Sequence, residues 1–157
     1  MKKSKLAIFG GKKTRTKSFE NQWLFDHRER KAVISVLKSN ELSGFLAFKG
    51  EKFFGGKKVL ELEKSFEKHY RIKHALAIQS ATAGLHAAIA ACDLEPGDEV
   101  ICTPYSMIAS ATAAVMHNAI PIFADIDPTN FNICPQSFKK LINKRTKAII
   151  VVHLFGY

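Results

Sequence analysis

The chain has little cysteine and no long apolar run. Its 157 residues include three cysteines, Cys92, Cys102 and Cys134, and no two of them form a C-x-x-C pair. An odd number of widely spaced cysteines argues against a disulfide framework and against a zinc site. No window approaches the roughly 18 to 20 apolar residues that a membrane span needs. The apolar stretch at residues 6–9 is too short for a signal peptide. These absences predict a protein of the reducing cytoplasm without a membrane partner.

Acidic residues are scarce relative to basic ones. The sequence has 24 Lys+Arg against 14 Asp+Glu, a formal charge of +10. Net charge informs about solubility and partners rather than about fold. Lysines are spread from Lys2 to Lys147, without the aromatic and basic alternation of an RNA-binding sheet. We therefore interpret the charge as a solvated surface and predict no nucleic-acid partner. A basic nucleic-acid-binding α/β domain is the alternative from another functional class.

The second half of the chain has the pattern of an α/β protein. Short apolar runs predict strands at 75–78, 99–102, 121–124 and 148–152, and the segments between them have helical spacing at 80–92, at 106–117 and from Pro135 onward. Strands that alternate with helices predict a mostly parallel sheet with helices on both faces. The fold class is therefore a partial three-layer α/β/α arrangement. The last run is continuously apolar, which is typical of a strand buried on both faces, so we expect the front part of a longer protein.

The first 74 residues differ from the rest and are predicted to form a separate helical and loop segment. Apolar residues at helical spacing predict helices at 26–37 and 59–70. A loop rich in glycine and phenylalanine lies between them at 42–56. Such a loop can close over a ligand or a partner chain, or simply pack against its own surroundings. The predicted domains are thus 1–74 and 75–157.

Small hydroxyl-bearing residues stand where the strand at 75–78 runs into the next helix. Ser80, Ala81 and Thr82 open this helix, so its free N–H groups and the Thr82 hydroxyl converge on a point that attracts phosphate. Plain N-capping is the alternative interpretation. No Walker or G-x-G-x-x-G motif supports a nucleotide site. The next strand delivers Tyr105 to the same edge of a parallel sheet. A phosphate beneath an aromatic ring suggests pyridoxal phosphate (PLP).

Other polar residues have a structural interpretation beside the functional one. Asp125 and Asp127 resemble a carboxylate pair, but Asp-x-Asp-Pro after a strand is typical of turns. His153 follows the last strand and is either close to a ligand or a structural histidine, and His86 is interpreted as a core or interface residue. No group of histidine, cysteine and carboxylate residues has metal-ligand spacing, so no metal is predicted.

Five motifs resemble one family in order and spacing. They are Ser-Ala-Thr-Ala-Gly-Leu-His at 80–86, Pro-Gly-Asp-Glu-Val-Ile at 96–101, Pro-Tyr-Ser at 104–106, Asp-Ile-Asp-Pro at 125–128 with Asn-Ile at 132–133, and Arg-Thr-Lys-Ala-Ile-Ile at 145–150 with Val-His-Leu-Phe-Gly at 152–156. In this respect the chain resembles the DegT/DnrJ/StrS-type sugar aminotransferases. The resemblance implies a homodimeric, fold-type I PLP enzyme of aminosugar or polysaccharide biosynthesis, with 75–157 as an incomplete large domain.

The resemblance also implies residue roles. Ser80, Ala81 and Thr82 would bind the cofactor phosphate, and Tyr105 would stack on its ring. The family usually has glycine at the position of Ala81. The Schiff-base lysine and the carboxylate that pairs with the pyridine nitrogen are expected beyond Tyr157, so no catalytic residue is assigned here.

The implied reaction moves an amino group from an amino-acid donor to a keto-sugar nucleotide or a cyclitol ketone. Since the chain as given has no such lysine, it should not transaminate by itself. A non-catalytic truncated remnant is therefore the main alternative.

Overall fold

A computed structural model describes residues 5–19, 25–42 and 44–157 of the chain. The chain divides into two compact units, residues 1–61 and 62–157. The predicted domain boundary after residue 74 stays a prediction. Within the described ranges, no helix is both long enough and apolar enough to cross a membrane.

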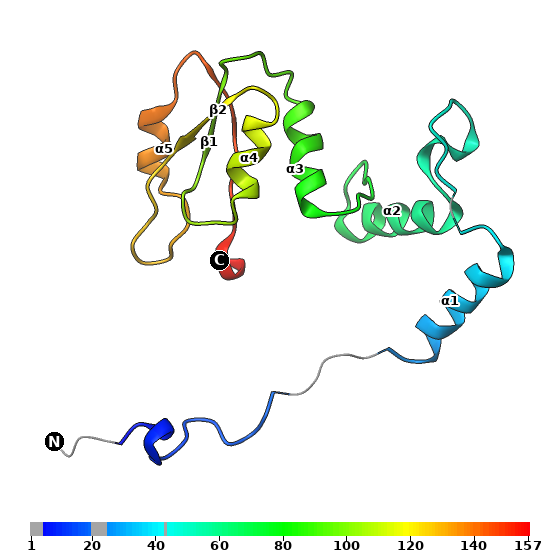
Figure 1. The fold of residues 1–157 in the computed structure, drawn as a ribbon, viewed down its shortest axis with the longest axis horizontal. Coiled ribbons are helices and arrows are strands. Elements are labelled where there is room, and N and C mark those ends of the chain that lie inside the picture. Colours follow the sequence, from blue (N-terminus) through cyan, green and yellow to red (C-terminus); the bar gives the residue numbers. More distant parts are fainter. Residues whose placement is uncertain (1–4, 20–24, 43) are drawn as a thin grey trace. The chain divides into compact units, whose positions relative to one another are not determined.

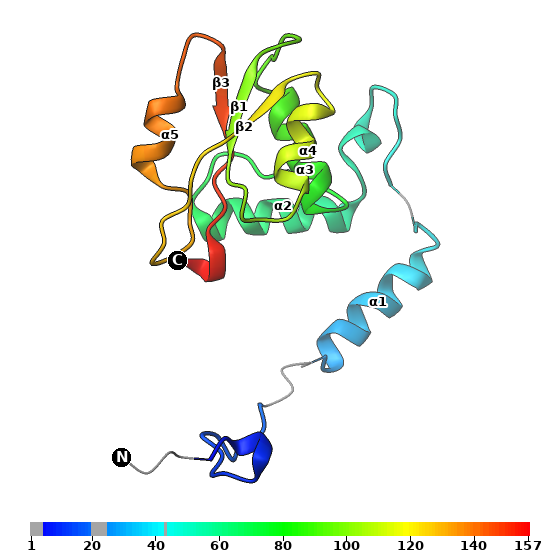
Figure 2. The same cartoon turned by 60° about the vertical axis from the view of Figure 1, so that its left-hand side comes forward.

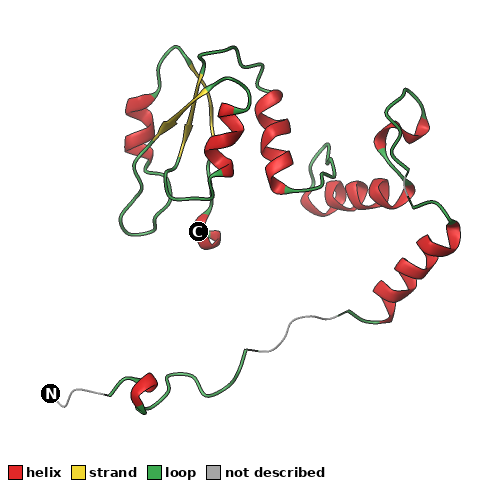
Figure 3. Cartoon of the chain, viewed as in Figure 1, coloured by secondary structure: helices red, strands yellow, loops and turns green. Residues whose placement is uncertain are grey.

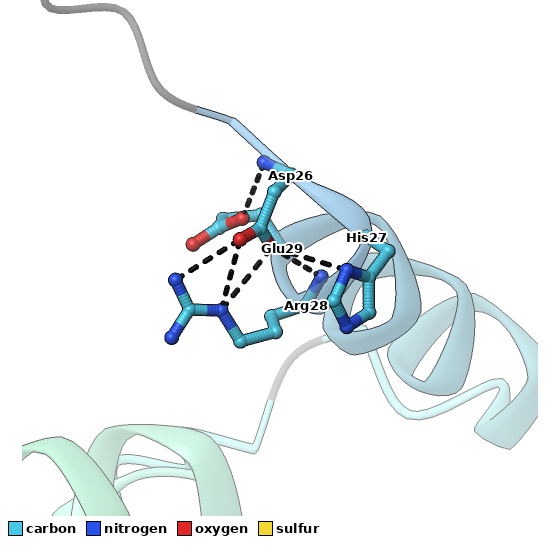
Figure 4. Close-up of polar contacts among 4 residues, drawn as sticks. All are labelled: Asp26, His27, Arg28 and Glu29. Atoms are coloured by element: carbon cyan, nitrogen blue, oxygen red, sulfur yellow. Dashed lines mark hydrogen bonds and ion pairs between the residues drawn. The ribbon is translucent and has the colours of Figure 1, made fainter.

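The first unit contains helix α1, His27–Ser39, which confirms the helix predicted at 26–37. Figure 4 shows how it begins: the Asp26 carboxylate accepts the N–H of Arg28 at 2.7 Å, and the Glu29 carboxylate accepts the N–H of Asp26 at 2.8 Å. This capping box satisfies N–H groups that the helix itself cannot bond. The Arg28 side chain also holds the pKa of Asp26 below its usual value. The helix ends at Asn40, in the left-handed conformation with φ 56°.

The loop at 42–56 brings two glycines into close approach. A Cβ atom on Gly44 would lie 2.3 Å from the Cα atom of Gly56, so a larger residue at 44 would collide with backbone. A short 3-10 helix, Glu51–Phe54, forms the far side of the loop, with the rings of Phe53 and Phe54 edge to face at 5.2 Å. Ser43 lies outside the described residues. The contact of this loop with a ligand or a partner chain stays a prediction.

Helix α2, Lys57–Tyr70, begins in the first unit and continues into the second. The predicted apolar stripe lies on this helix at the expected spacing. Its residues remain between 38% and 61% exposed: Val59, Leu62, Phe66 and Tyr70. The helix is therefore amphipathic as predicted, but its apolar face is not part of a core within the described residues.

The second unit is built on a three-stranded parallel sheet. Strand β1, Glu99–Cys102, lies in the centre, between β2, Ile120–Phe123, and β3, Thr146–Ile149. Helices α3, Ala81–Ala90, and α4, Ala109–Val115, lie on one side of the sheet, and α5, Pro135–Leu141, lies on the other, as Figures 1 and 2 show. Figure 3 distinguishes the helices, strands and loops of the chain by colour. The predicted α/β class is confirmed.

The core has two parts, one on each face of β1. Val100 and Cys102 point to the α3 and α4 side, and Ile101 points to the α5 side, each no more than 1% exposed. Burial raises the pKa of the Cys102 thiol. The first part also contains Ile89, Ala113, Ala114, Ala119 and Ile150, and the second contains Ala124 and Ile133 with Phe138 and Leu141 beside them. Both faces of β1 are therefore covered, whereas the outer strands β2 and β3 are only partly buried.

Most predicted elements of this unit are found, with different ends. The strand at 99–102 has the predicted bounds, and α5 begins at Pro135 as expected. The helices predicted at 80–92 and 106–117 are shorter, and β3 begins and ends before the predicted 148–152. Ile150 still donates its N–H to Ile101 at 2.8 Å. The apolar run therefore continues the sheet beyond the regular strand.

The prediction of a strand at 75–78 is wrong. The structure assigns no strand there. Two of its N–H groups bond to glutamate side chains of α2 instead, Ala75 to Glu67 at 3.2 Å and Ala77 to Glu63 at 2.8 Å. Apolar periodicity indicates an extended conformation but does not supply the neighbouring strand that a sheet requires.

The start of β1 depends on a buried carboxylate. Glu99 is 3% exposed, and its carboxylate accepts Asn143 Nδ2 at 2.7 Å and pairs with an Arg145 nitrogen at 2.5 Å. We expect Glu99→Ala to lower the free energy of unfolding in urea by roughly 1 to 3 kcal/mol, because these bonds tie β1 to the segment that leads into β3. Glu95→Ala, an exposed glutamate, is the control. Equal stability of the two variants would contradict this role.

Candidate functional site

The first turn of α3 presents unbonded backbone N–H groups. Ser80 is the N-cap in an extended conformation, and its hydroxyl accepts the N–H of Ala83 at 3.1 Å. Its carbonyl accepts the N–H of Gly84 at 3.0 Å. Among the residues that the structure describes, the N–H groups of Ala81 and Thr82 have no hydrogen-bond partner. The capping interpretation of Ser80 is therefore confirmed, and two further N–H groups remain available.

These two N–H groups lie where an anion is favoured. The N-terminus of a helix carries a partial positive charge, and free N–H groups there bind phosphate. Ala81 and Thr82 are both exposed. Ala81 lies inside α3 and is not among the residues with positive φ, so its backbone does not require glycine. The methyl group that distinguishes this chain from the usual family pattern therefore causes no backbone strain.

Tyr105 lies in the loop that follows β1. Its N–H donates to the Thr103 hydroxyl at 3.2 Å, and its side chain is 51% exposed. Figures 1 and 2 show that this loop and the start of α3 lie at the same end of the sheet. The structure thus brings the Ser80–Thr82 turn and the Tyr105 loop to one edge.

A second aromatic residue accompanies Tyr105. The ring of Phe131 lies 5.7 Å from that of Tyr105, with an angle of 39° between the planes. Phe131 has φ 63°, the left-handed conformation, in the loop between β2 and α5. Sequence reasoning missed this residue, because its position depends on the path of a loop. The unusual placement of a phenylalanine in the polar stretch 125–132 was the only available signal.

The aspartates after β2 hold a turn. The Asp127 carboxylate accepts the N–H and the hydroxyl of Thr129 and the N–H of Asn130. The Thr129 hydroxyl is the main cause that lowers the pKa of Asp127. The backbone of Asp125 bonds to the Ser137 hydroxyl and to the N–H of Cys134. The turn interpretation of the pair is confirmed for Asp127.

Among the described residues, His153 and His86 make their polar and ring contacts with residues outside the Ser80–Thr82 turn. His153 is exposed, with Nδ1 3.3 Å from the carbonyl oxygen of Tyr157. His86 is half-buried on α3, and its ring lies 5.9 Å from that of His117. In the described part of the chain, no three metal-ligating side chains come together.

Comparison with known proteins decides the family. The model of the DegT/DnrJ/EryC1/StrS aminotransferase family matches residues 34–157. The chain belongs to this family. The resemblance seen in the sequence is therefore confirmed, and aminotransferases of this family depend on PLP.

Individual relatives agree with this membership. The chain is similar to the GDP-perosamine synthase of Caulobacter vibrioides, with 42% identity over 101 residues, 64% of this chain and 27% of that protein. Among solved structures, the aminotransferase from Psychrobacter cryohalolentis shares 34% identity at a TM-score of 0.73, over 87% of this chain and 32% of that one.

Another similar structure is NtdA of Bacillus subtilis with the bound cofactor PMP, at 26% identity and a TM-score of 0.69 over 83% of this chain and 28% of that one. The chain therefore spans about a third or less of the length of these relatives.

The Asp127 turn allows a titration test. The carboxyl group of Asp127 should titrate below its usual range, and Thr129→Val should raise its pKa because the hydroxyl donor is lost. A pKa lower in the folded than in the unfolded state stabilises the fold above the unfolded-state pKa, and this contribution is lost as the pH falls through the folded-state value. NMR titration of the carboxyl carbon measures the shift. Thr129→Ser keeps the hydroxyl and is the control, so an equal pKa in both variants would refute the assignment.

Proposed function

We propose that this chain is the N-terminal part of a PLP-dependent aminotransferase of aminosugar or polysaccharide biosynthesis. The observation that carries the proposal is that the first turn of α3, with the free N–H groups of Ala81 and Thr82, and the loop after β1 lie at the same end of the sheet. Family membership supports the same reading, because the family consists of aminotransferases. We place the protein in the cytoplasm.

The residues at this edge fit a phosphorylated planar cofactor. The phosphate of PLP would accept the N–H groups of Ala81 and Thr82 and the Thr82 hydroxyl. Ser80 would hold the turn in place, since its own hydroxyl is already bonded to Ala83. The exposed ring of Tyr105 would lie over the pyridine ring, with Phe131 supporting it from beside.

The chain's own contribution is therefore binding and orientation. When bound, PLP supplies the electron sink that lets an amino group leave the donor and join the acceptor. Charge-assisted bonds at the phosphate anchor one end of the cofactor, and a ring stacked on its face restricts rotation about that anchor. The lysine and the carboxylate that complete the chemistry are proposed to lie beyond Tyr157.

The proposed acceptor is the ketone of a nucleotide sugar or of a cyclitol, and the proposed donor is an amino acid. The similarity to a GDP-perosamine synthase supports a nucleotide-linked sugar. An excess of basic residues would favour such an anionic substrate. We further propose a homodimer, with the loop at 42–56 near the shared site, and no nucleic-acid partner.

Thr82→Ala tests the phosphate contact. We expect weaker retention of PLP in the complete protein, because a hydrogen bond to a charged group contributes roughly 1.5 to 3 kcal/mol. Equilibrium dialysis followed by the absorbance of released PLP measures the loss. Thr82→Ser keeps the hydroxyl and should retain the cofactor, whereas unchanged retention in the alanine variant would count against the proposed site.

Tyr105 offers an independent test of ring stacking. Tyr105→Ala should shift the absorption band and the induced circular dichroism of bound PLP, because the ring loses the aromatic face above it. Tyr105→Phe keeps that face and should leave both spectra close to those of the unchanged protein. Spectra of the alanine variant that match the phenylalanine variant would exclude stacking by Tyr105.

A further inference from the structure

Two glutamates of α2 bind the backbone of the segment that leads into α3. The Glu63 carboxylate accepts the N–H of Ala77 at 2.8 Å, and the Glu67 carboxylate accepts the N–H of Ala75 at 3.2 Å. Both glutamates are half-buried. All four residues belong to the second unit, residues 62–157. These carboxylates therefore accept backbone N–H groups that a neighbouring strand would bind in a sheet.

The spacing of the two hydrogen bonds is the one expected between a helix and an extended chain beside it. Residues four apart on a helix are separated by about 6 Å along its axis, and residues two apart on an extended segment by about 6.6 Å. The earlier glutamate bonds the later alanine, so the segment runs antiparallel to α2. Alternate N–H groups of an extended chain point the same way, which allows Ala75 and Ala77 to bond to one helix face. The result is a two-point attachment.

This attachment lies next to the first turn of α3. Ala77 precedes the N-cap Ser80 by three residues. The neighbouring Ile78 side chain packs against α3 at Gly84, where a Cβ atom would come within 2.3 Å of Ile78 Cδ1. Residues 77–78 are thus held on one side by Glu63 and on the other by α3, directly before the N-cap of that helix. The N–H groups of Ala81 and Thr82 directly follow that N-cap.

We propose that Glu63, assisted by Glu67, is a positioning residue for the anion site at Ala81 and Thr82. The carboxylate does not contact the cofactor; it fixes the extended segment, and the segment fixes the first turn of α3. The inference rests on the proposed function, since it takes the phosphate of PLP as the anion. Glu67 has the weaker role, because its bond is longer and lies five residues before Ser80.

The experiment compares the affinity of the complete protein for PLP with its affinity for pyridoxal, which lacks the phosphate. The affinity for PLP divided by the affinity for pyridoxal isolates the phosphate contact, because a general loss of stability lowers both affinities. Glu63→Leu should lower this ratio about ten-fold, as expected when a charged hydrogen bond is removed and part of its effect reaches the site. Glu63→Gln keeps an oxygen acceptor for Ala77 and should stay within about three-fold.

Two further variants separate the possible outcomes. Glu95→Leu makes the same change at an exposed glutamate and should leave the ratio unchanged. Thr82→Ala removes a proposed phosphate ligand itself and should lower the ratio. An unchanged ratio in Glu63→Leu, or equal losses of PLP and pyridoxal affinity, would overturn the positioning role while the Thr82→Ala result still upholds the proposed function. An unchanged ratio in Thr82→Ala would instead reject the phosphate site, and the positioning role with it.

Glu67→Leu provides the same test if Glu63→Leu does not fold. The ratio should then fall by about three-fold, because the second attachment point remains. A ratio equal to that of Glu95→Leu would overturn the proposal. Circular dichroism of each variant without cofactor verifies that it is folded.

Discussion

Burial of β1 on both faces is the constraint on which the second unit depends. Val100, Ile101 and Cys102 are no more than 1% exposed, so helices must cover both sides of the sheet. Because all three strands are parallel, each connection has to return across the sheet before the next strand begins. Helices in such connections start at the carboxyl ends of the strands. The loop of Tyr105 therefore lies at the carboxyl ends of the strands, and Figures 1 and 2 show the start of α3 at the same end of the sheet.

The elements with strong local signals were predictable from the sequence. The strand at 99–102 contains the apolar run Val100–Cys102 and lies between the turn at Gly97 and Pro104, and both of its ends agree with the structure. Pro135 begins α5 because its fixed φ and missing N–H suit the first helical position. Asp26 with Glu29 forms the capping box that begins α1.

Features that depend on distant residues were not predictable. The segment 75–78 has the apolar pattern of a strand, but its N–H groups bond to carboxylates up to 14 residues away. Glutamates on an amphipathic helix usually face solvent, so nothing local marks Glu63 and Glu67 as partners of a backbone. Phe131 is a similar case, because its contact with Tyr105 follows from the left-handed conformation of one loop residue.

The two interpretations of Ser80 turn out to be compatible. Its hydroxyl accepts the N–H of Ala83 at the start of α3. Among the described residues, the N–H groups of Ala81 and Thr82 remain without a hydrogen-bond partner. The proposed phosphate site would differ from an ordinary cap in its position at the end of the sheet rather than in residue type. The sequence therefore predicted the cap correctly, and the use of the neighbouring N–H groups as a phosphate site stays a prediction.

The fit of Ile78 against Gly84 has an evolutionary consequence. The two residues occupy one shared volume, since a side chain at 84 would enter the space that the end of Ile78 fills. Ile78 is about half exposed, so its end has room to rotate away when this contact is given up. Among homologous chains, a side chain at 84 should therefore be accompanied by a shorter residue or a different side-chain rotamer at 78.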